Sequence, residues 1–101
     1  MTERRLAAIL VADVVGYSKL VGDDEAGTLA RVGTLRREII EPVIANHGGR
    51  LFKAVGDGFL VEFASAVQAV IAALAIQKAS QVLPLRIGVH LGDVKIGRAH
   101  V

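Results

Sequence analysis

Two aspartates set into apolar, strand-like runs are the residues of this sequence best suited to chemistry. Asp13 follows the apolar run 6–12, and Asp57 lies between two glycines and two further apolar runs. A carboxylate at the end of a buried strand needs a cation or hydrogen-bond donors, because desolvating an unpaired charge is costly. Two adjacent carboxylates also favour a cation between them. Mg²⁺ or Mn²⁺ suits such oxygen ligands, and Mg²⁺ commonly binds through one or two carboxylates plus substrate phosphates.

The expected order of strands and helices brings these aspartates toward each other. Residues 6–12 form a short continuous apolar run, which predicts a buried strand. Residues 51–55 and 59–63 predict two strands joined through the glycine-flanked Asp57. A long helical stretch separates the first strand from the second. A second helix, from Ala66 to about Val82, precedes a fourth strand.

This βαββαβ order predicts an α+β, ferredoxin-like fold, with an antiparallel or mixed four-stranded sheet and helices on one face. Right-handed crossovers make the first and second strands parallel, so the end of the first strand and the hairpin tip share one sheet edge. With the third strand between them, Asp13 and Asp57 become near neighbours. Residues 14–18 form a turn whose Gly16 lets the backbone approach a ligand, and exposed amides there can hold phosphate oxygens.

The first helical stretch carries its own start and interruption signals. Asp23, Asp24 and Glu25 place carboxylates where a helix leaves its first amides free. Pro42 lacks a backbone donor and clashes with the preceding turn, so it is expected to kink or split this stretch.

Four motifs in this order resemble the class III nucleotide cyclase catalytic domain, from about residue 4 to residue 94. The motifs are Ala12-Asp13-Val14-Val15-Gly16-Tyr17-Ser18, His47-Gly48-Gly49-Arg50, Lys53-Ala54-Val55-Gly56-Asp57-Gly58 and Arg86-Ile87-Gly88-Val89-His90-Leu91-Gly92-Asp93. The resemblance implies that residues 1–94 are the N-terminal portion of such a domain, truncated at its C-terminal third. Residues 95–101 are unlike the family's continuation and match a translated sequencing adapter, which gives the hypothesis that they are an artefact.

In that family, two aspartates hold two metal ions that activate the ribose 3′-hydroxyl of ATP and hold its triphosphate. The resemblance assigns these roles, with Mg²⁺ or Mn²⁺ as the ions, to Asp13 and Asp57, and it adds the carbonyl of Val14 as a metal ligand. It thereby identifies the chain with an enzyme, an adenylate cyclase that converts ATP to cyclic AMP and pyrophosphate in cyclic nucleotide signalling.

Substrate contacts follow from the same resemblance. The residues expected to meet the phosphates through backbone amides are Gly16, Tyr17 and Ser18. Lys53 matches the family's adenine-reading lysine, a position at which guanylate cyclases carry glutamate. Strand alternation is expected to place Lys53 on the same sheet face as Leu51 and Val55.

The family's site forms across a head-to-tail homodimer, in which one subunit supplies the metal-binding aspartates and the other an asparagine and an arginine that stabilise the transition state. The segment bearing that pair does not appear in this sequence. The resemblance therefore implies that the chain by itself makes little cyclic AMP.

Simpler interpretations stay open for each residue. Taken singly, Asp57 can be a hairpin-turn residue, Asp13 a turn or helix-cap residue, and Lys53 a surface lysine that covers apolar area. A non-catalytic nucleotide-binding or dimerisation module is the alternative function, because this fold serves many activities. The glycine-acidic hairpin signature of diguanylate cyclases and the stacking aromatics of RNA-recognition modules are both missing.

Composition narrows the number of domains, the partners and the cellular location that fit the sequence. A chain of 101 residues with 52% hydrophobic content predicts one domain. The net charge of +2 is too small, and too interspersed with acids, to favour nucleic acid as a partner. The absence of cysteine is consistent with a reducing compartment, so we expect a cytoplasmic location, and no segment predicts a membrane span.

Overall fold

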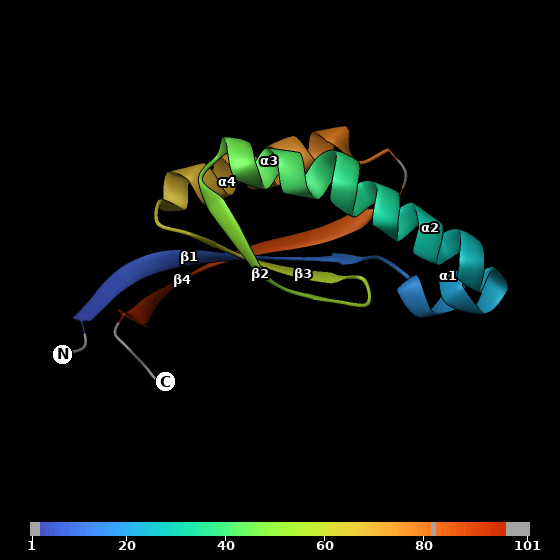
Figure 1. Cartoon of the computed structure of the whole chain (residues 1–101), viewed down its shortest axis with the longest axis horizontal. Coiled ribbons are helices and arrows are strands. Elements are labelled where there is room, and N and C mark those ends of the chain that lie inside the picture. The colour runs from blue at the N-terminus through green and yellow to red at the C-terminus, as the bar shows by residue number, and fades with distance from the viewer. Residues whose placement is uncertain (1–2, 82, 97–101) are drawn as a thin grey trace.

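The fold is that of a computed structural model, which describes residues 3–81 and 83–96. Its elements run in the order β1 (Glu3–Val14), α1 (Tyr17–Asp23), α2 (Glu25–Leu35), the π-helical segment η1 (Arg36–Ile40), α3 (Glu41–Asn46), β2 (Gly49–Val55), β3 (Gly58–Phe63), α4 (Ala66–Ala79) and β4 (Leu85–Ile96) (Figure 1). The four strands form one sheet in the order β2-β3-β1-β4. The predicted α+β fold and the insertion of β3 between β1 and β2 are confirmed. All three strand pairings are antiparallel, so the sheet is not mixed.

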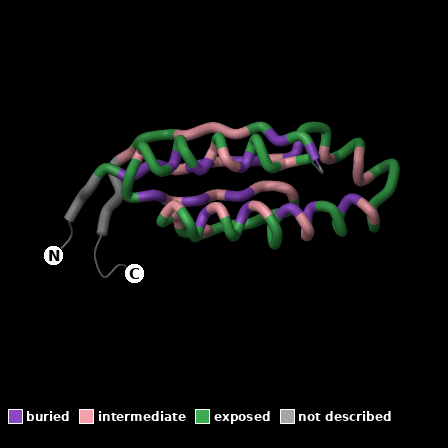
Figure 2. Tube along the Cα trace, turned by 90° about the horizontal axis from the view of Figure 1, so that it is seen from above, coloured by how far each residue is buried: buried purple, intermediate pink, exposed green. Residues whose placement is uncertain are grey.

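The helices α3 and α4 cover one face of the sheet, and α2 extends past the end of the sheet toward α1 (Figure 1). Alternate residues of β1 and β3 face them, because successive side chains in a strand point to opposite sides. The buried residues on this face of the two strands are Ala8, Leu10, Ala12, Val14, Phe59, Val61 and Phe63, and they pack against Leu35, Ile40, Ile44, Ala69, Ala72 and Ile76. Figure 2 shows buried positions recurring along both layers. Asp13 lies between two buried positions and therefore points to the other side, here called the helix-free face.

The first helical stretch begins earlier than predicted. The acidic residues predicted to mark a helix start do so, since the side chain of Asp24 accepts a hydrogen bond of 3.0 Å from the amide of Gly27 and caps α2. They mark the second helix of the stretch, however, because the short helix α1 precedes α2. Helix α1 contains no fully buried residue, so hydrophobic periodicity could not reveal it.

Pro42 is accommodated by a change of helix type. The segment η1 ends at Ile40, two residues before Pro42, and the amide of Glu41 donates to the carbonyl of Arg36, five residues back. Proline cannot donate the usual bond to the carbonyl four residues earlier, and a π-bulge is a common way to absorb such a defect. The helical run thus continues from α2 into α3 without a break.

No helix within the described ranges is both long enough and apolar enough to cross a membrane. Strand β4 runs through residues 95 and 96, which pair with Arg4 and Glu3 of β1. The rest of the predicted tail, residues 97–101, lies outside the described residues.

Candidate functional site

Asp13 and Asp57 meet at one edge of the sheet, where β1 ends, the β2–β3 hairpin turns and β4 begins (Figure 1). The amide of Val14 donates a hydrogen bond of 3.0 Å to Oδ2 of Asp57, across 43 positions of sequence. The β1–β3 ladder ends with the pair Ala12 and Phe59, and the same register continued would bring Val14 opposite Asp57. The carboxylate thus takes over the acceptor role of a backbone carbonyl where the ladder stops.

The hairpin that carries Asp57 turns in two residues. Val55 pairs with Gly58, and Gly56 has a φ of 58°, which suits glycine at the first central position of a type II′ turn. The ring of Tyr17 lies beside this turn, since a Cβ placed on Gly56 would be 3.9 Å from its Cε2 atom. Tyr17 also packs against the core, so its side chain connects α1 to the hairpin tip.

Asp13 forms an ion pair with Arg86, its directly opposite partner on β4. Nη2 of Arg86 lies 3.0 Å from Oδ1 of Asp13, and Nε donates to the same oxygen at 3.2 Å. The exposed fractions of the two side chains are 35% for Asp13 and 71% for Arg86. Solvent therefore screens the pair, and its contribution to stability is about 0–1 kcal/mol.

These residues line one open pocket of about 390 Å³. Its lining residues are Asp13, Val14, Gly16, Tyr17, Ser18, Lys19, Asp57 and Arg86. Six of them, five from residues 13–18 and Asp57 from the hairpin, are residues that the sequence singled out. Two cations, Lys19 and Arg86, were not assigned a role. Arg86 stands in a motif quoted for the family resemblance, and only the pairing of β1 with β4 reveals its place beside Asp13.

The turn between β1 and α1 is shorter than predicted. Val14 belongs to β1 and α1 begins at Tyr17, so that only Val15 and Gly16 connect them. The first amides of a helix have no partner within it, and those of Tyr17 and Ser18 occupy that position beside the pocket.

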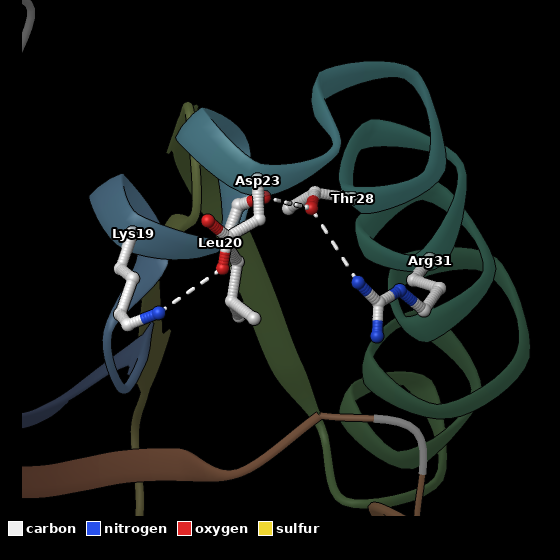
Figure 3. Close-up of polar contacts among 5 residues, drawn as sticks. All are labelled: Lys19, Leu20, Asp23, Thr28 and Arg31. Carbon is white, nitrogen blue, oxygen red and sulfur yellow. Dashed lines mark hydrogen bonds and ion pairs between the residues drawn. The ribbon is translucent and has the colours of Figure 1, made fainter.

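Helix α1 is held in place by a buried hydroxyl. Thr28 of α2 is fully buried and donates a hydrogen bond of 2.9 Å to the carbonyl of Leu20, while Arg31 donates to the Thr28 hydroxyl at 3.4 Å (Figure 3). Lys19 is 3.1 Å from Asp23 one turn later, in an ion pair that lies in solvent. The pocket wall formed by α1 is therefore fixed against α2.

Lys53 lies outside this pocket, and its predicted orientation is partly wrong. The register along β2 shifts between Leu51, opposite Val61, and Lys53, opposite Leu60. Val61 is buried beneath the helices, whereas Leu60 faces the other side, so this bulge turns Lys53 away from the face of Leu51. The exposed Lys53 thus lies on the helix-free face, which Asp13 also shares.

The donor set limits which ions the pocket can hold. No group of three or more histidine, cysteine, aspartate or glutamate residues suited to a metal occurs within the part of the chain that the structure describes. Two carboxylates remain, and among the described contacts each uses one oxygen, Oδ1 of Asp13 and Oδ2 of Asp57. Two carboxylates with open coordination positions fit a hard cation that takes its other ligands from phosphates or water.

Comparison with known proteins places this geometry among nucleotide cyclases. The chain matches no protein-family model. It is 47% identical, over 103 aligned positions covering 92% of the chain, to putative adenylate cyclase 3 of Rhizobium meliloti (strain 1021). A crystal structure of an adenylate/guanylate cyclase/hydrolase from Silicibacter pomeroyi superposes with a TM-score of 0.83, at 42% identity over 95% of the chain. The adenylyl cyclase CyaB of P. aeruginosa, at 22% identity and a TM-score of 0.84 over 96% of the chain, shares the fold.

The chain spans only part of each of these proteins. It covers 18% of the length of the Rhizobium relative, 62% of the Silicibacter chain and 61% of the CyaB chain. What the comparisons establish is thus the kind of domain to which the residues of the pocket belong.

Proposed function

Because the chain belongs to the class III adenylate/guanylate cyclases, we propose that its pocket binds a nucleoside triphosphate together with divalent metal, and that the whole protein converts ATP to cyclic AMP and pyrophosphate. One observation carries this proposal. Asp13 and Asp57, far apart in the sequence, line the same pocket beside two cations. An acid pair for metal and basic groups for phosphate are the two requirements of such a ligand.

The two aspartates are the proposed metal ligands, together with the carbonyl of Val14. Asp57 is oriented by the amide of Val14, and Asp13 by Arg86. Two ions of Mg²⁺ or Mn²⁺ would polarise the phosphates and favour the ionised form of the ribose 3′-hydroxyl. The protein's part is to hold both carboxylates at one sheet edge, where they line the same pocket.

The phosphates are proposed to lie against the start of α1. There the amides of Gly16, Tyr17 and Ser18 can donate to phosphate oxygens. Arg86 and Lys19 line the same pocket, and a guanidinium offers several N–H donors in a fork that matches phosphate geometry. These cations would offset the negative charge that two carboxylates and a triphosphate would otherwise bring together.

Lys53 is proposed to contact the adenine ring. It lies in the same cross-strand row as Leu60 and Val11, on the face that Asp13 shares. Two strand spacings of about 4.8 Å and one two-residue step of about 6.8 Å separate Lys53 from Asp13, which amounts to roughly 12 Å. An extended nucleotide with its phosphates at Asp13 can reach this lysine across the helix-free face.

The helix-free face is also where a second subunit is proposed to dock. Asp13 and Lys53 both lie on it, so a head-to-tail homodimer through this face would enclose the nucleotide between two copies. Because the chain spans 62% of the Silicibacter structure, catalysis and dimerisation are proposed for the whole protein. That this chain alone makes little cyclic AMP stays a prediction.

Calorimetry on the 101-residue chain tests the proposed site. Titration of the wild-type chain with Mn²⁺ and ATP together should give a measurable heat of binding. Asp13→Ala and Asp57→Ala should each abolish this heat. Glu38→Gln serves as the control, because it removes an exposed carboxylate on η1, outside the pocket. Equal heats from the wild type and both aspartate variants would contradict the proposal. Binding without cyclic AMP formation by the whole protein would favour the alternative of a non-catalytic nucleotide-binding module.

A further inference from the structure

The ion pair between Arg86 and Asp13 occupies a carboxylate that the proposed function needs for metal. We propose that the Arg86 guanidinium is the counter-ion of Asp13 in the free protein and leaves it for phosphate oxygens when a triphosphate binds. Arg86 then opposes metal binding when no nucleotide is present and links metal binding to triphosphate binding. This inference rests on the proposed function and concerns the order in which the same site fills.

The contact geometry explains why the guanidinium opposes a metal ion on Asp13. Nε and Nη2 of Arg86 both donate to Oδ1 of Asp13, at 3.2 and 3.0 Å, so that this single oxygen carries the whole interaction. A divalent ion on either oxygen of this carboxylate would lie close to the guanidinium, and the two positive charges would repel each other. Since the residues are direct cross-strand partners, the backbone keeps Asp13 within reach of the Arg86 side chain even after its guanidinium has turned away.

The pair is weak enough to exchange. The Arg86 side chain is 71% exposed and that of Asp13 35%, and pairs of this kind are opposed by solvent screening and side-chain entropy. Their typical strength corresponds to a change of roughly two- to fivefold in an equilibrium constant. Arg86 also lines the pocket, so its guanidinium can reach a bound anion by a rotamer change, without movement of the strand.

A group that pairs either with Asp13 or with phosphate couples the two ligands. Metal binding frees the guanidinium, which then favours the triphosphate, and triphosphate binding frees Asp13, which then favours the metal. Such coupling is reciprocal. Loss of the guanidinium should therefore act in opposite directions, strengthening the binding of metal alone and weakening the binding of triphosphate. An arginine with a merely structural role would weaken both when removed.

The test compares Arg86→Gln with the wild-type chain by calorimetry, with two probes. For Mn²⁺ alone, the variant should bind about two- to fivefold more tightly. For a preformed complex of Mn²⁺ with inorganic tripolyphosphate, it should bind on the order of tenfold more weakly. Arg50→Gln is the matched control. Arg50 forms a 2.7 Å ion pair with Glu62, its cross-strand partner on β3, and does not line the pocket of Asp13 and Asp57, so neither affinity should change.

The outcomes separate this inference from the function on which it rests. If Arg86→Gln weakens both probes equally, or changes neither, the proposed exchange is wrong. Arg86→Lys keeps the charge but lacks the guanidinium fork, so tripolyphosphate binding should stay weaker than in the wild type. Binding within twofold of wild type would show that charge alone suffices and would contradict the role of the fork. A wild-type chain that binds Mn²⁺ no better than Asp13→Ala would overturn the metal site itself, and the proposed function with it.

Discussion

Asp57 has a structural role that can be separated from its proposed chemical role by two substitutions. Its Oδ2 accepts the 3.0 Å hydrogen bond from the amide of Val14, in a partly buried position. Asp57→Ala removes both this acceptor and the charge. Asp57→Asn removes the charge only, because the side-chain amide oxygen can accept from the same N–H group.

The expected magnitudes follow from that contact. A hydrogen bond to a charged acceptor contributes about 1.5–3 kcal/mol, and partial exposure reduces this to about 1–2 kcal/mol here. In a domain of this size each 1 kcal/mol shifts the melting temperature by roughly 4–8 °C. Asp57→Ala should thus lower the Tm by roughly 4–16 °C. Asp57→Asn should stay within about 4 °C of wild type, since it keeps the bond and removes repulsion between Asp57 and Asp13.

The assay is thermal unfolding followed by circular dichroism in EDTA, with Mn²⁺ calorimetry on the same samples. Both variants should lose Mn²⁺ affinity by on the order of tenfold or more, because each lacks one anionic ligand. A Tm for Asp57→Ala equal to that of the wild type would refute the structural role. Wild-type Mn²⁺ affinity in Asp57→Asn would refute the role of its charge at the metal site.

Three further substitutions test the hairpin turn, the support of helix α1 and the proposed adenine contact. Gly56→Ala should lower the free energy of unfolding, measured by thermal unfolding, by about 1–2 kcal/mol, because the φ of Gly56 is 58°. Gly22→Ala is the control and should not destabilise the protein, because Gly22 lies in helix α1 and no atom lies within 4 Å of the new Cβ. Thr28→Val should lower the free energy of unfolding, measured with urea, by about 1–2 kcal/mol, since the carbonyl of Leu20 loses the Thr28 hydroxyl as a donor. It should also weaken Mn²⁺–tripolyphosphate binding. Unchanged stability would contradict the role of Thr28. Lys53→Glu in the whole protein should lower ATP use relative to GTP, and an unchanged ratio would make Lys53 a surface residue.

The meeting of Asp13 and Asp57 could be predicted because it depends on topology alone. Apolar runs fix the strands, and the handedness of the crossover fixes which strand ends lie together. Neither step requires knowing the pairing register. The turn at Gly56 could also be predicted without the register, because the glycine that allows it is recognised from the adjacent sequence alone.

What escaped prediction depends on register and on tertiary support. Arg86 is the partner of Asp13 only because β1 and β4 pair with one particular offset, which two apolar strands do not reveal. The bulge between Leu51 and Lys53 reverses the alternation on which the orientation of Lys53 was based. Helix α1 is held by the bond from Thr28 to Leu20 and buries no residue fully, so it leaves no periodic pattern.

An anomalous difference map of the chain crystallised with Mn²⁺ and a non-hydrolysable ATP analogue would locate the metal directly. We expect a manganese peak at the sheet edge, with a carboxylate oxygen of Asp13 and one of Asp57 at ligand distances of roughly 2.0–2.6 Å. Arg86 should be directed at the phosphates and no longer at Asp13. A manganese peak elsewhere, or bound analogue with both aspartates still paired only to Val14 and Arg86, would show that Asp13 and Asp57 do not hold the metal.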